Sequence, residues 1–134
     1  MTTVPAPASP RSVLAVTRSR MPHPVLVMAL AGTLDAETSS AFADYVDDTL
    51  RNRPSTRVLI LDLTELALLS HGGLRAVHRA SRRIERHGIR VMIAAAPGSL
   101  VAKGLESSTG PTFRVFDTRR DAIAATESAA LMSA

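Results

Sequence analysis

The sequence contains no cysteine and no tryptophan, and these absences exclude several classes of protein. Without cysteine there can be no disulfide and no thiolate-bound metal, and a cytoplasmic location is the natural expectation. The aromatic residues are three phenylalanines and one tyrosine, too few to stack the successive bases of a single-stranded nucleic acid. The core must therefore be built from aliphatic side chains.

Long apolar runs are lacking as well. The longest, Val25 to Ala31, has the length of a strand and falls far short of the ~20 residues of a membrane helix. The first residues, MTTVPAPASPR, have no apolar stretch typical of a signal peptide. We expect residues 1–11 to form a disordered tail and residues 12–134 to form one domain, with no membrane partner.

Lysine is almost absent, since Lys103 is the one lysine among the 16 basic residues. The formal net charge is +4. Such an excess permits an acidic protein, a nucleic acid or a membrane surface as a partner, but it does not select among them.

Apolar runs with the character of strands alternate with segments that have helical periodicity. The expected strands are residues 12–18, 25–31, 57–63, 89–95 and 113–116, and the expected helices are 36–50, 74–87, 97–105 and 119–132. The resulting order, β-β-α-β-α-β-α-β-α, predicts an α/β fold. We expect a mixed, mostly parallel sheet of about five strands with helices packed on it.

Binding sites in such sheets gather at the carboxyl ends of the strands. This rule selects two loops, Gly32 to Asp35 and Leu69 to Gly73. Asp35 suits the N-cap of the first helix. Gly72 and Gly73 predict a tight turn whose backbone N–H groups face outward at the start of the second helix, a ready site for an anion. No phosphate-loop fingerprint is present, which argues against nucleotide binding.

Several catalytic and metal-binding patterns are absent. Ser70, His71 and Asp62 do not predict a hydrolase, because adjacent Ser and His cannot easily reach triad geometry and no G-x-S-x-G occurs. Asp62 lies inside an expected strand and suits a structural hydrogen bond. His71, His78 and His87 lack metal-ligand spacing, so we expect them to be exposed to solvent. We assign no catalytic residue, no metal and no cofactor.

Arginines recur along one side of the second helix at positions 75, 79, 82 and 86. A solvated helix face is the first interpretation, and contact with an acidic groove on a protein partner is the second. Nucleic-acid binding comes third, because Glu85 interrupts the row and a strand, not a helix, precedes this helix.

Three motifs in the right order resemble the STAS domain of anti-sigma factor antagonists. Residues 61–95 (LDLTELALLSHGGLRAVHRASRRIERHGIRVMIAA) are similar to the family's strand, D-S-[ST]-G-L motif and helix. Residues 32–35 (GTLD) are similar to its G-x-[IL]-D, and residues 113–122 to its last strand and helix start. The resemblance covers about residues 12–128. It implies a STAS-like fold and a protein that binds an anti-sigma factor, often itself a serine kinase, and thereby frees a sigma factor.

The chain departs from the family at the motif that is usually phosphorylated. Against D-S-[ST]-G-L it has Ser70-His71-Gly72-Gly73-Leu74. Gly72 occupies the position of the phosphorylated hydroxyl and has no oxygen to accept a phosphoryl group. We therefore expect the usual serine switch to be absent, with Ser70 as a weak candidate for a displaced acceptor.

We predict a non-catalytic protein-interaction regulator that acts on sigma-factor-dependent transcription. Its partner-binding residues are predicted to be Thr33, Asp35, Ser70, His71, Gly72, Gly73, Arg75 and His78. The alternatives are a STAS module that binds a small ligand (lipid, anion or nucleotide) or serves as a transporter-associated subunit, and a nucleic-acid-binding protein that uses the arginine face. The sequence leaves open whether the domain is a monomer or a weak dimer.

Overall fold

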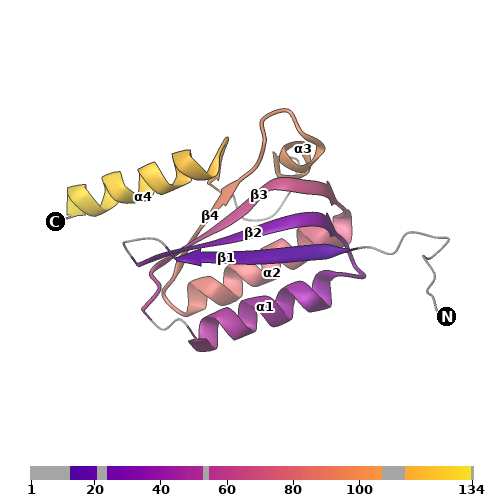
Figure 1. Ribbon diagram of the computed structural model, residues 1–134, viewed down its shortest axis with the longest axis horizontal. Helices are drawn as coiled ribbons and strands as arrows, with labels where there is room; N and C mark the ends of the chain where they lie inside the picture. The colour runs from indigo at the N-terminus through magenta and orange to yellow at the C-terminus, as the bar shows by residue number, and fades with distance from the viewer. Residues whose placement is uncertain (1–12, 21–23, 53–54, 107–113, 134) are drawn as a thin grey trace, which may run out of the picture.

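The computed structural model describes residues 13–20, 24–52, 55–106 and 114–133 (Figure 1). The elements of this part of the chain follow the predicted order: β1 (Leu14–Arg20), β2 (Val25–Leu34), α1 (Ser39–Asn52), β3 (Val58–Leu69), α2 (His71–Arg86), β4 (Arg90–Ala94), α3 (Leu100–Glu106), β5 (Val115–Phe116) and α4 (Arg119–Ser133). The predicted tail, residues 1–11, lies outside the described residues, as do Ser12 and Phe113 at the ends of the predicted outer strands.

The strands form one sheet in the order β1-β2-β3-β4-β5. β1 runs antiparallel to β2, and every other neighbouring pair is parallel. The prediction of a mixed, mostly parallel sheet is thus confirmed. Because β2, β3 and β4 point the same way, their carboxyl ends share one edge of the sheet (Figure 1).

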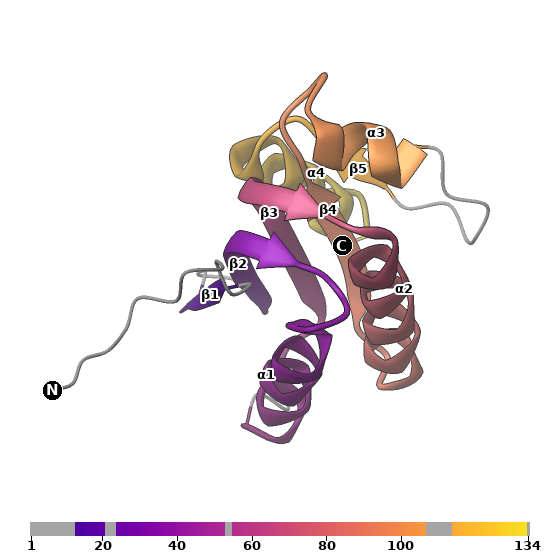
Figure 2. The ribbon, with the colours of Figure 1, turned by 90° about the vertical axis from the view of Figure 1, so that its right-hand side faces the viewer.

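Helices cover the two faces of the sheet unequally (Figure 2). Alternate side chains of the strands pack with α1, α2 and α3 in the larger core, whose fully buried members include Leu26, Met28, Phe42, Leu61 and Ile84. The opposite side chains form a smaller core with α4, made of Val25, Val27, Ile60, Met92 and Ala122. Strands buried on both faces explain the continuous apolar runs in the sequence.

β2 and β3 extend beyond their predicted ends. The pairing between them shifts at Ala29/Ala31 and again at Gly32/Thr33, and each shift leaves one additional residue on β3. At the first bulge, the carboxylate of Asp62 accepts hydrogen bonds from the backbone N–H of Thr64 at 3.0 Å and from its hydroxyl at 2.6 Å. The prediction that Gly32 ends its strand and begins a loop is therefore wrong, because the bulges let the pairing continue to Leu34.

α1 begins at Ser39 and not at the predicted Ala36. The intervening turn is capped by Asp35, whose Oδ1 accepts from the backbone N–H groups of Glu37 at 2.9 Å and Thr38 at 3.0 Å. Thr38 returns the interaction, since its hydroxyl oxygen accepts from the N–H of Asp35 at 3.0 Å. This reciprocal pattern is that of a capping box, placed one turn ahead of the helix.

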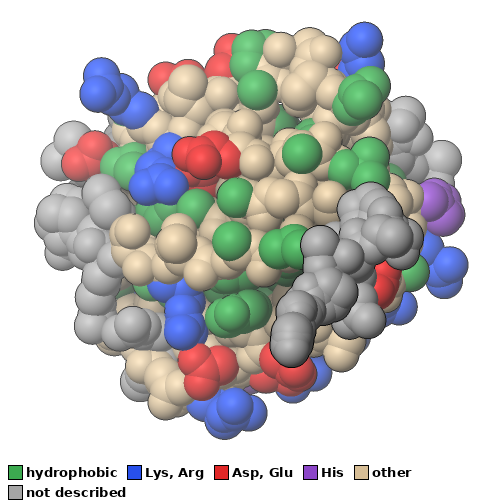
Figure 3. Space-filling model, turned by 45° about the vertical axis from the view of Figure 1, so that its right-hand side comes forward, with side chains coloured by type: hydrophobic (Ala, Val, Ile, Leu, Met, Phe, Trp, Pro, Cys, Tyr) green, Lys and Arg blue, Asp and Glu red, His purple; other side chains and the backbone are tan. Residues whose placement is uncertain are grey.

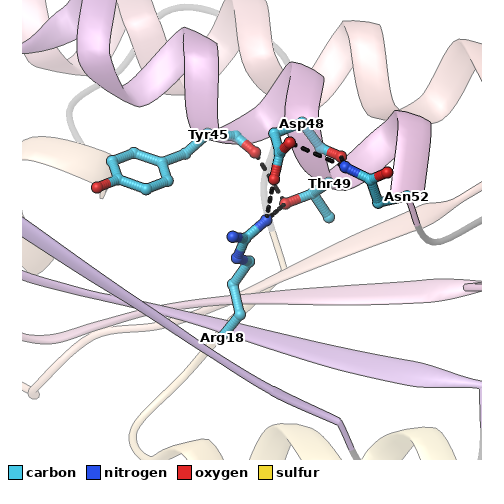
Figure 4. A network of polar contacts seen from close by, with 5 residues as sticks. All are labelled: Arg18, Tyr45, Asp48, Thr49 and Asn52. Carbon is cyan, nitrogen blue, oxygen red and sulfur yellow. Dashed lines mark hydrogen bonds and ion pairs between the residues drawn. The ribbon is translucent and has the colours of Figure 1, made fainter.

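The edge strand β1 is tied to α1 by the polar network in Figure 4. The guanidinium of Arg18 donates to the carboxylate of Asp48 at 2.7 Å and to the hydroxyl of Thr49 at 3.1 Å, and it lies 6.0 Å from the ring centre of Tyr45. Asn52 donates to the same carboxylate at 2.8 Å. The hydrogen bond from Arg18 holds the pKa of Asp48 below its usual 3.8. The network thus holds the edge strand β1 against α1.

Candidate functional site

Ser70 joins the end of β3 to the start of α2. It is the N-cap of α2, in an extended conformation with φ −82° and ψ 174°. Its hydroxyl accepts from the N–H of Gly73 at 3.1 Å, and its carbonyl accepts from the N–H of Leu74 at 2.8 Å. Its own N–H donates to the carbonyl of Leu34 at 3.0 Å. Ser70 is thus a capping residue that also links α2 to the end of β2.

Gly72 and Gly73 lie in the first turn of α2, so the prediction that they form a separate loop is wrong. Neither has a positive φ. A Cβ atom on Gly73 would overlap the carbonyl oxygen of Leu34 and lie 2.6 Å from its carbonyl carbon. A Cβ atom on Gly72 would lie 3.1 Å from the Cβ and backbone nitrogen of Ala36. The glycines allow α2 to approach the end of β2 closely, and they are not needed for a left-handed backbone.

Thr33 and Asp35 lie at the same edge of the sheet. The N–H of Thr33 donates to the carbonyl of Val13 at 2.8 Å, and its carbonyl accepts from the hydroxyl of Thr38 at 2.9 Å. In the pairing of β2 with β3, Thr33 lies opposite Leu68. The next pair is Leu34 with Leu69, and Ser70 follows it. The structure therefore brings Thr33, Asp35 and the start of α2 together, with the Asp35 carboxylate engaged in the local capping interaction.

His71, Arg75 and His78 recur on α2 at positions i, i+4 and i+7, and therefore share one side of the helix. His71 and Arg75 are exposed near the start of the helix, and His87 is exposed at its C-terminal cap, as expected. His78 is half-buried, so the expectation that it is exposed is wrong. Burial, and next the charge of Arg82, lower the pKa of His78 below 6.5.

Two exposed apolar side chains, which the sequence pattern did not predict, flank Thr33. Val13 is 66% exposed and Leu68 is 45% exposed. Leu66 is buried and Leu68 is exposed, although residues two apart in a regular strand share a face. The second bulge of β3 lies between them and turns Leu68 outward. The apolar run Leu66–Leu69 contains no local signal of that reversal.

Figure 3 shows the surface on the side of the molecule that carries the ends of β2 and β3. Apolar side chains are spread over the middle of the face that carries β1, and most charged side chains lie toward its margins (Figure 3). The end of β2, the end of β3 and the start of α2 thus adjoin a surface that is partly apolar.

Asp62 belongs to the interior of the fold, as expected. It is 5% exposed and also accepts a hydrogen bond from Nε of Arg119 at 2.8 Å. Burial would raise the pKa of its carboxyl group, but the hydrogen bonds from Thr64 and Arg119 outweigh burial and hold the pKa below the usual 3.8. Asp62 is therefore a charged structural residue that joins β3 to the first residue of α4.

The described residues include no cluster that could hold a metal ion and no helix that could cross a membrane. Across this part of the chain, no three His, Asp or Glu side chains lie close enough to hold a metal ion. Of the helices described, none is long and apolar enough to cross a membrane.

Solved structures share the fold. An anti-sigma factor antagonist from Mycobacterium paratuberculosis is 19% identical, with a TM-score of 0.66 over 84% of this chain and 93% of that chain. The antagonist SpoIIAA in its unphosphorylated form is 17% identical, with a TM-score of 0.63 over 84% of this chain and 98% of that chain. The murine anion transporter Slc26a9 is 16% identical, with a TM-score of 0.67 over 88% of this chain and 22% of the transporter. No curated protein sequence matches the chain.

The chain spans nearly the whole length of the two antagonists but about a fifth of the transporter. A family model described as the STAS domain matches residues 16–122. This match runs from β1 into α4 and therefore includes Ser70 and all of α2. The chain therefore belongs to the STAS domain family.

Proposed function

We propose that the protein is an anti-sigma factor antagonist, a non-catalytic regulator that binds an anti-sigma factor and so controls sigma-factor-dependent transcription in a bacterial cytoplasm. The observation that supports it best is the fold shared with two anti-sigma factor antagonists, of which the chain covers 93% and 98%.

The proposed docking surface is the exposed region around the start of α2, which we name the α2-start surface. It comprises the exposed Val13, Leu68, His71 and Arg75 and the half-buried Thr33, Asp35, Ser70 and Gly72, with the buried Gly73 beneath them. It combines two exposed apolar side chains with polar and basic ones, the mixture typical of transient protein interfaces. His78, half-buried and seven residues after His71 on α2, lies at its margin.

This antagonist is proposed to work without the usual phosphorylation of the motif. Gly72 has no hydroxyl, and a side chain at this position would press against Ala36. The hydroxyl of Ser70, the displaced candidate, already accepts the capping hydrogen bond from Gly73. Capture of the partner is then controlled by the amount of antagonist or by a different signal.

His71 offers the cleanest test of docking, because it is exposed at the first position of α2. We compare His71→Asp with His71→Asn, which has the same shape but no charge. A carboxylate near a helix N-terminus favours the helix, so both variants should fold, as circular dichroism melts will check. The negative charge imitates the effect of a phosphate in the middle of the surface.

The partner is the protein captured by the tagged full chain from its native host and identified by mass spectrometry. We expect the Asp variant to bind this anti-sigma factor at least about tenfold more weakly than the Asn variant, or about 1.4 kcal/mol, by calorimetry. Equal affinities would show that the partner docks elsewhere. If no anti-sigma factor is captured, the proposed antagonist function is refuted. When the chain is incubated with ATP and the captured anti-sigma factor, its intact mass should stay constant. A phosphate on Ser70 would show that the phosphorylation site has moved to that residue.

A second candidate rests on the likeness to the transporter. The murine anion transporter contains a region with this fold, so a STAS module that binds a small ligand or serves a transporter as a separate subunit is the alternative. Native mass spectrometry separates the two, because a small molecule bound to the purified chain would favour this alternative.

A further inference from the structure

A groove lies between α1 and α2, and its lining does not include the α2-start surface. Its volume is about 460 Å³. Small side chains hollow the surface where the two helices meet, with Ala43 on α1 opposite Ala76 and Ala80 on α2. Phe42 and Val46, each 1% exposed, lie beneath them. The groove therefore has an apolar floor that belongs to the core.

One wall of the groove is strongly basic. Arg79, Arg82, Arg83 and Arg86 line it, at positions i, i+3, i+4 and i+7 of α2, so the row spans two turns or about 10 Å. Of the described residues in the lining, Asp47 alone is acidic, and it pairs with Nε of Arg83 at 2.7 Å. The wall thus keeps an excess of positive charge after this ion pair is counted.

The exposure of these arginines argues against a small anion as the ligand. The side chain of Arg83 is 56% exposed even in its ion pair, and the other three arginines are exposed as well. A single ion pair in water contributes only about 0–1 kcal/mol. A ligand must therefore contact several guanidinium groups at once, which requires several negative charges spread over two turns.

The shape of the groove separates an acidic protein from a nucleic acid. A helix that binds DNA protrudes into the major groove, whereas this row of arginines faces a hollow whose other wall is α1. A phosphate backbone has no apolar side chain to fill the hollow over Phe42 and Val46. An amphipathic helix has both parts, because its apolar side chains can enter the hollow while carboxylates on the adjacent face meet the arginines.

We propose that the groove between α1 and α2 binds an acidic amphipathic helix of a partner protein, as a second docking site beyond the α2-start surface. The carboxylates of that helix, spaced by three and four residues, face Arg79, Arg82 and Arg86. One of them competes with Asp47 for Arg83. The arginine row thus has a binding role that a solvated face would not have.

The probe is a fluorescent helical peptide of about 18 residues, with Glu at i, i+3, i+4 and i+7 beside a Leu stripe. A matched peptide carries Gln in place of Glu. The test variant combines Arg79→Gln, Arg82→Gln and Arg86→Gln, and it leaves the ion pair of Arg83 intact. The control variant combines Arg57→Gln, Arg90→Gln and Arg120→Gln, which are exposed arginines outside the groove lining. Both variants lose the same net charge.

Fluorescence anisotropy at about 0.15 M salt, where long-range charge effects are screened, measures binding to the full chain. We expect the Glu peptide to bind at least about tenfold more tightly than the Gln peptide. The test variant should lose about tenfold and the control variant less than about twofold. The neutral change Ala43→Leu, which fills the hollow, should also weaken binding.

Three results would overturn the proposal. Equal losses in the test and control variants would show that net charge alone attracts the peptide. Absence of binding to the Glu peptide would show that the groove is not a helix site. Tighter binding of a random-sequence DNA duplex, lost in the test variant, would assign the arginines to nucleic acid. None of these measurements involves an anti-sigma factor, so the proposed function and this proposal can fail separately.

Discussion

At Gly73, the start of α2 lies so close to β2 that a Cβ atom would overlap the carbonyl oxygen of Leu34. The same carbonyl accepts a hydrogen bond from the N–H of Ser70, so the contact is fixed on both sides. A reader of the sequence sees two glycines before an apolar helix and expects a turn. Glycine is required at position 73 because of the carbonyl of Leu34 in β2, almost forty residues earlier in the chain, and no local sequence pattern reveals that contact.

Gly73→Ala and Gly72→Ala should therefore differ strongly in stability. Gly73→Ala must move α2 away from a backbone carbonyl, and we expect it to lower the free energy of unfolding by about 3 kcal/mol. At Gly72 the contacts of 3.1 Å with Ala36 can relax, and alanine favours the helix by about 1 kcal/mol over glycine. The net change there should stay within about 1 kcal/mol. Urea unfolding measures both, and a fully stable Gly73→Ala would contradict the close packing of α2 on Leu34.

At the scale of elements, the sequence predicted the order but not all the ends. The order follows from apolar periodicity, which each element carries in its own residues. The predicted strand ends at Leu63, where polar Thr64 and Glu65 follow the apolar run. The strand continues to Leu69 because Asp62 holds a bulge through its bonds to Thr64. A bulge is a property of two paired strands, so a single segment cannot reveal it.

The bonds of Asp62 predict a ranking of two variants. Asp62→Ala removes the acceptor for the N–H and the hydroxyl of Thr64 and for Arg119. It should lower the free energy of unfolding by about 1–3 kcal/mol, the usual cost of removing hydrogen bonds to a charged group. Arg119→Gln keeps the bulge, and because the Arg119 side chain is itself 42% exposed, the loss should stay within about 1 kcal/mol.

Denaturant unfolding of the two variants tests this ranking. A larger loss for Arg119→Gln would show that the ion pair to α4, and not the bulge in β3, is the main role of Asp62. Equal losses would mean that the two interactions cannot be separated.

At the scale of the whole molecule, α2 serves two surfaces. Its first turn belongs to the α2-start surface, and its third and fourth turns form the basic wall of the groove. The sequence showed the row of arginines, because a helical period is local. It could not show that the row faces a hollow, because the hollow depends on Ala43 and Phe42 of α1 lying beside α2. The row of arginines was thus readable from the sequence, and its concave setting was not.

Two titratable groups, the half-buried His78 and the buried Asp62, make the stability of the chain depend on pH. Burial, and next Arg82, hold the pKa of His78 below the 6.5 of an unfolded chain. The unfolded chain therefore binds this proton more readily, and stability falls as the pH drops through 6.5 toward the folded pKa. Burial raises the pKa of Asp62, but the hydrogen bonds from Thr64 and Arg119 outweigh it and keep the pKa below 3.8. Stability therefore falls again as the pH drops through 3.8, because the native carboxylate resists protonation.

We thus expect the free energy of unfolding to fall in two steps on acidification, and each step has its own variant. His78→Gln stays neutral at every pH and should remove the upper step while leaving the lower one. Asp62→Asn should lower stability at neutral pH and reduce the lower step, because the amide cannot take up the proton. The part of that step that Asp48 contributes should remain, since Arg18 also holds the pKa of Asp48 below 3.8. Urea unfolding of both variants and the wild type, from about pH 8 to about pH 3, measures the two steps. If the upper step persists in His78→Gln, it belongs to another group, and the lowered pKa of His78 is not its cause.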